Sequence, residues 1–166
     1  MRRHAWLLII LLALSGFPAA QTRSGIYVGK VRLKMGTAQS LVISDLSKKY
    51  EVGLMGIWKN GAELFSVRDN ALEVGLVSFR NKRLTGIRNI LFSETSSGDF
   101  PEAFYMAIKS FTTHAGGPCK IETASRDKSW RGVMFRCPAR LLAVGISTDQ
   151  DGKSTTGISE IIGDAE

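Results

Sequence analysis

The residues of this chain that could do chemistry are few, and the two cysteines come first. Cys119 and Cys137 are the only cysteines among the 166 residues. A structural zinc site needs about four ligands, and a redox pair would take C-x-x-C spacing, which is absent. In CKIETA and GVMFRC each cysteine alternates with apolar residues, as in neighbouring strands bridged on their buried side. We therefore predict a structural disulfide between Cys119 and Cys137.

His114 is the one histidine outside the N-terminal segment, and it is the candidate for acid–base catalysis. A serine hydrolase of the common type would also show a G-x-S-x-G elbow, which the chain lacks. His114 follows a predicted helix over 101–113, where its side chain meets the terminal carbonyl dipoles. DQDGK at 149–153 departs from the spacing of a calcium loop and fits a hairpin turn. We predict no enzyme, no metal and no cofactor, with a small exported hydrolase using His114 as the alternative.

Aromatic and basic side chains are the candidates for binding. SRDKSWR at 125–131 predicts a polar hairpin tip that presents an aromatic ring between basic residues, the composition that interface hot spots favour. The alternative is that the ring folds back over the edge of the sheet. A second basic group is predicted at a hairpin near residue 81, where a solvated sheet face is the alternative. The candidate binding residues are Trp130, Arg131, Lys128, Trp58, Arg80 and Arg83.

The N-terminal 20 residues have the order of a secretory signal peptide. Arg2 and Arg3 precede an apolar run over 5–14, and small, turn-prone residues follow it to Ala20. The run is shorter than the roughly 20 residues that a membrane-spanning helix needs; a buried N-terminal helix is the alternative. We therefore predict cleavage near Ala20 and an exported protein, periplasmic or secreted. Such compartments are oxidising, which favours the disulfide.

Composition and charge limit the partners. Hydrophobic residues make up 44% of the chain, enough for a buried core, and the formal net charge is +7. Loss of Arg2 and Arg3 with the signal peptide leaves about +5. A moderately basic exported protein favours an envelope protein or an anionic cell-surface component as partner. We expect no nucleic acid and no integral membrane segment in the mature form.

The predicted elements appear in the same order twice. Alternation over 25–35 predicts a strand, spacing over 37–52 predicts a helix, and strands follow around the Asn60–Gly61 and Asn81–Lys82 turns. A strand near 89, the helix over 101–113 and strands to residue 162 repeat that order. We predict an α+β fold, in which helices pack on one face of an antiparallel sheet. After the signal peptide (1–20), two tandem strand–helix–meander units cover 21–88 and 89–166, the second with the disulfide.

One stretch of the first unit resembles a known family. Residues 31–87, with VRLKMGTAQSLVISDLSKKYEV, GIW and VGLVSFRNKRLTGI, resemble the small exported SmpA/OmlA-type domains. The tandem order is also similar to that of beta-lactamase inhibitor proteins. The resemblance implies a short helical layer on a small antiparallel sheet and a role in outer-membrane protein assembly. The chain departs from the lipoproteins because no lipid-anchoring cysteine follows the signal peptide. The function expected is therefore a non-enzymatic binding or envelope-assembly module, acting through protein–protein or anionic-surface contacts.

Overall fold

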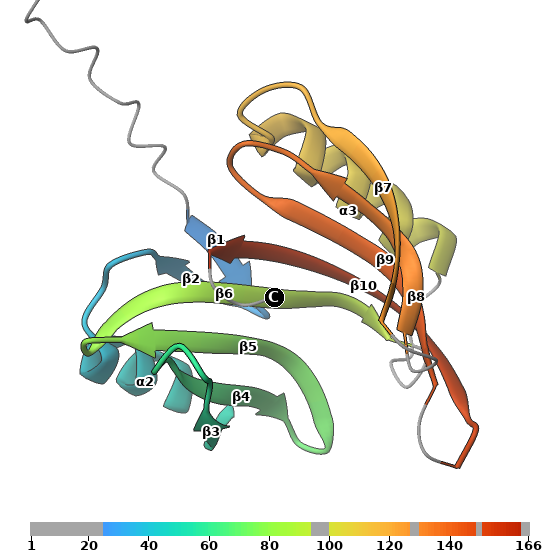
Figure 1. The fold of residues 1–166 in the computed structure, drawn as a ribbon. Helices are drawn as coiled ribbons and strands as arrows, with labels where there is room; N and C mark the ends of the chain where they lie inside the picture. The colour runs from blue at the N-terminus through green and yellow to red at the C-terminus, as the bar shows by residue number, and fades with distance from the viewer. Residues whose placement is uncertain (1–24, 94–99, 127–129, 149–150, 164–166) are drawn as a thin grey trace, which may run out of the picture.

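The fold consists mainly of antiparallel strands in two sheets (Figure 1). The structure, a computed structural model, describes residues 25–93, 100–126, 130–148 and 151–163, so the predicted signal peptide lies outside it. A small sheet pairs β1 (Gly25–Val28) with β2 (Val31–Lys34). The large sheet has eight strands in the order β3-β4-β5-β6-β10-β9-β8-β7. Its strands are β3 (Glu51–Ile57), β4 (Glu63–Asp69), β5 (Leu72–Arg80), β6 (Arg83–Ser93), β7 (Lys120–Arg126), β8 (Trp130–Arg136), β9 (Leu141–Thr148) and β10 (Ser154–Gly163).

The predicted fold class, α+β with helices packed on one face of an antiparallel sheet, is wrong. Strands hold 58% of the described residues and helices 18%, and the arrangement is β-sandwich-like. The two helices, α2 (Gln39–Ser47) and α3 (Phe100–His114), are short. The error begins at Gly29, whose φ of 54° turns the chain inside the strand predicted over 25–35. The halves of that segment then pair with each other, and β1 contacts β5 and β6 as part of a second layer of strands.

The local turn predictions hold, and the helix predicted over 37–52 is present as α2 but ends at Ser47, since Glu51 and Val52 already belong to β3. Asn60 and Gly61 connect β3 to β4, and the φ of 78° at Gly61 is one that glycine adopts at no steric cost. Asn81 and Lys82 connect β5 to β6 with φ of 51° and 58°, values that suit a two-residue hairpin turn. The helix predicted over 101–113 is α3. These features depend on a few neighbouring residues, which is why sequence patterns indicate them.

The centre of the large sheet is the pairing of β6 with β10. Ile87 lies opposite Ile162, and Phe92 lies opposite Ile158, with a bulge between Ile158 and Ser159. This contact joins two meanders, β3 to β6 and β7 to β10, into one continuous sheet. The division predicted between residues 88 and 89 falls inside β6. Figure 1 shows the sheet strongly curled, with α2 toward one end and α3 toward the other.

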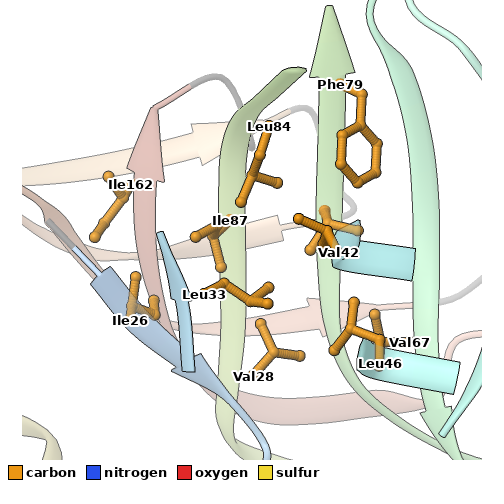
Figure 2. Packing of buried hydrophobic residues seen from close by; sticks show 11 residues of the cluster. Ile26, Val28, Leu33, Val42, Leu46, Val67, Phe79, Leu84, Ile87 and Ile162 are labelled. Carbon is orange, nitrogen blue, oxygen red and sulfur yellow. The ribbon is translucent and has the colours of Figure 1, made fainter. Parts of the chain in front are cut away.

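Two main groups of buried side chains lie on the side of the sheet that faces β1, β2 and the helices. The first brings Ile26, Val28 and Leu33 of the small sheet against Val42 and Leu46 of α2 and the side chains of β4, β5, β6 and β10 (Figure 2). In the second, Ala107 and Phe111 of α3 pack with side chains of β6, β9 and β10, which are Phe92, Leu142 and Ile158. This side of the sheet is therefore occupied by core packing.

The predicted disulfide between Cys119 and Cys137 is present. It joins the residue before β7 to the residue after β8, so it closes the open end of that hairpin. Cys137 contacts the second core group, but Cys119 is exposed, and Ile121 on β7 is 69% exposed. The expectation that both cysteines lie on a buried side is wrong for Cys119, because β7 is the outer strand of the sheet.

Within residues 25–93, 100–126, 130–148 and 151–163, no helix is long and apolar enough to cross a membrane.

Candidate binding site on the sheet face

A hollow of about 210 Å³ lies against the face of the large sheet that points away from α2 and α3. Successive strand residues point to opposite faces, so Arg88 and Ser159 point away from the core that holds Ile87 and Ile158. Five strands contribute to its wall, with Glu73 from β5, Arg88 from β6, Trp130 from β8, Ser147 from β9, and Thr155 and Ser159 from β10. The hollow therefore spans the β6–β10 junction of the two meanders.

The indole of Trp130 packs closely against two glycines of the sheet. Gly132 and Gly145 lie opposite each other on β8 and β9. A Cβ atom on Gly145 would come within 2.6 Å of the indole Cζ2, and one on Gly132 within 2.9 Å. Any larger residue would therefore displace the ring. With one side covering this glycine pair, the half-buried indole presents its remaining surface to the hollow.

Arg88 and Glu73 give the hollow one positive and one negative group. Burial raises the pKa of the Glu73 carboxyl, while the charges of Arg88 and Arg68 oppose that rise. Burial also lowers the pKa of the Arg88 guanidinium, while the negative charge of Glu73 acts to raise it. The Nε of Arg88 is buried and has no hydrogen-bond partner. Buried donors are usually satisfied, so this guanidinium has capacity for a further acceptor.

Of the residues predicted at the 125–131 hairpin, the structure describes Trp130 and Arg131, and Arg131 does not join Trp130 in the hollow. Trp130 lies within the sheet, opposite Arg126 on β7 and Ser147 on β9. Arg131 is the next residue on β8, so its exposed side chain points to the opposite face. Lys128 lies outside the described residues. Of the described residues of this group, Trp130 alone lines the hollow.

The remaining predicted residues lie elsewhere. Trp58 follows β3, and its backbone N–H donates to the Ala62 carbonyl at 2.9 Å. Arg80 and Arg83 are opposite each other at the β5–β6 turn, and Arg83 Nη1 donates to the Gly36 carbonyl at 3.1 Å. His114 is exposed in the last turn of α3. Among the described residues, no three His, Cys, Asp or Glu side chains are grouped so as to hold a metal ion.

Sequence reasoning missed Arg88, Glu73 and the hydroxyl residues of the hollow. A charged residue on one face of a strand is normally solvated, and neither Arg88 nor Glu73 belongs to a motif. The available signal was the segment GIRNILF, in which Arg88 interrupts an apolar run. An arginine between buried strand residues often has a specific role, because a buried charge needs a partner.

The chain was also compared with protein families, curated proteins and solved structures, and none of them matches it.

Proposed function

We propose that this protein is an exported, non-enzymatic binding or envelope-assembly module, and that the hollow beside Trp130 is its ligand-binding site. The observation that carries the proposal is the joint placement of Trp130 and Arg88 in one recess on the sheet face. Binding sites combine apolar and aromatic walls with a few polar groups that fix orientation, and tryptophan and arginine are enriched among residues that dominate binding energy.

The rigidity of the site supports the same proposal. Each strand that contributes to the hollow has a hydrogen-bonded neighbour on both sides, and the disulfide closes the β7–β8 hairpin that holds Trp130. A site on paired strands needs little ordering when a ligand arrives, so less of the interaction energy is lost. Export is proposed from the N-terminal sequence, and a disulfide-bonded protein is typical of oxidising compartments.

The test compares what the mature protein and two variants retain from an extract of the cell envelope. Immobilised wild-type protein is expected to retain a component that Trp130→Ala and Arg88→Gln retain much less. Trp58→Ala is the control, because that tryptophan lies outside the hollow. Identical retention by all four proteins, with folding verified by melting temperature, would show that the hollow is not the binding site.

A further inference from the structure

The chemistry of the hollow narrows the class of ligand it fits. The first constraint is the aromatic surface. The indole of Trp130 lies over Gly132 and Gly145, so it cannot swing toward the sheet to close the hollow. The ring thus forms a fixed apolar platform at one side of a recess whose other walls combine polar side chains with Ile90, Phe92 and Ala143. A ligand that fits has one apolar face of about the size of a ring.

The second constraint is charge. Arg88 and Glu73 interact electrostatically across the hollow, so an anionic ligand drawn to Arg88 would meet the Glu73 carboxylate. A cationic ligand drawn to Glu73 would meet Arg88. A neutral ligand with neighbouring donor and acceptor groups satisfies both, since a carboxylate accepts hydrogen bonds and a guanidinium donates them.

The third constraint is the rest of the wall. Ser147, Thr155 and Ser159 contribute hydroxyl groups, each of which can donate or accept a hydrogen bond. An apolar ligand would leave these hydroxyl groups and the charged groups of Arg88 and Glu73 without hydrogen-bond partners. An added peptide strand is also a poor fit, because β6, β10, β9 and β8 have no free backbone edge on which it could pair.

We propose that the hollow binds one neutral sugar ring of a glycan. The C–H face of the ring stacks on Trp130, and adjacent hydroxyls of the same ring donate to Glu73 and accept from Arg88. The volume of about 210 Å³ is below the range of about 300–1,000 Å³ typical of pockets that enclose a whole drug-sized ligand. The site therefore takes one ring of a longer chain, whose remaining rings extend outside the hollow. This inference rests on the proposed function and adds the ligand class.

The experiment titrates the disulfide-bonded mature protein with maltohexaose, cellohexaose and chitohexaose, which are neutral, and with an oligomer of a uronic acid. Binding is followed by tryptophan fluorescence and by saturation-transfer NMR. We expect at least one neutral oligosaccharide to bind, and the acidic oligomer to bind more weakly because of Glu73. Trp130→Ala and Arg88→Gln should each weaken the dissociation constant by about ten-fold or more. Trp58→Ala should leave it unchanged.

Three results overturn the inference: no neutral oligosaccharide binds, the acidic oligomer binds better, or Trp58→Ala weakens binding as much as Trp130→Ala. Trp130→Leu keeps apolar bulk over the glycine pair without an aromatic ring, so it serves in place of Trp130→Ala if the alanine variant fails to fold. Other results distinguish the sugar inference from the proposed function. If wild type binds no sugar, but Arg88→Gln and the Trp130 variants lose binding to an envelope protein or to anionic vesicles, the hollow binds another ligand and only the sugar inference is wrong. If no ligand depends on either residue, both proposals fail.

Discussion

The buried ion pair between Arg140 and Glu160 offers the sharpest test of how this fold is held together. Arg140 comes just before β9, and Glu160 lies on β10. Arg140 Nη1 donates to Glu160 Oε1, and each side chain is only 6% exposed. Removing one partner leaves the other charge buried and unpaired, which costs about 3–5 kcal/mol. Arg140 already has one buried nitrogen, Nε, without a partner.

We expect Glu160→Gln to lower the free energy of unfolding by about 3 kcal/mol, the lower end of that range, because the amide keeps one acceptor oxygen. For a domain of this length, the melting temperature should fall by about 10 °C. The combined replacement Arg140→Met with Glu160→Leu should recover most of the loss, since an apolar pair of similar volume removes both charges.

The assay is urea unfolding of the oxidised protein, followed by circular dichroism, with melting temperature as a second measurement. Asp45→Asn is the matched control. Asp45 and Lys48 also form an ion pair, at 2.7 Å, but the side chains are 57% and 67% exposed. Exposed pairs contribute about 0–1 kcal/mol. If Glu160→Gln lowers the free energy of unfolding no more than Asp45→Asn does, the buried ion pair does not stabilise the β9–β10 region.

Three further predictions concern the disulfide, the hollow and the core. Replacing Cys119 and Cys137 together by serine should lower the free energy of unfolding by about 3 kcal/mol in the chain-entropy model, measured by urea unfolding; an unchanged midpoint would contradict it. Burial raises the pKa of Glu73, so as pH rises through about 4–5 the unfolded chain releases a proton that the folded chain keeps, and stability is lost. Glu73→Gln has no carboxyl group to titrate, so its melting temperature should rise relative to that of wild type between about pH 4 and pH 7. A relative fall over this range would contradict a raised pKa for Glu73. Leu46 is fully buried, and Leu46→Ala should destabilise by about 2–5 kcal/mol. Leu41→Ala on the same helix, where the side chain is 60% exposed, should change the free energy of unfolding by less than about 0.5 kcal/mol. If the two variants lose equal stability in urea unfolding, α2 does not bury Leu46 in the core.

Local sequence determined the features that depend on a few adjacent residues. Gly61, Asn81 and Lys82 adopt positive φ values at the turns that connect the strands, and such preferences belong to the backbone of those residues. The apolar spacing over 101–113 predicted a helix because side chains three and four positions apart share a face. The disulfide followed from the presence of only two cysteines and from the predicted compartment.

Only the tertiary structure decided which strands meet. Nothing in the alternation over 25–35 shows that Gly29 turns the chain, so that β1 and β2 form a separate layer. The pairing of β6 with β10 joins residues about 70 positions apart, through backbone hydrogen bonds that any pair of strands can make. That pairing is what brings Arg88, Trp130 and Glu73 to one hollow. Side chains from strands distant in the chain carry no common spacing, so the site exists only in the folded sheet.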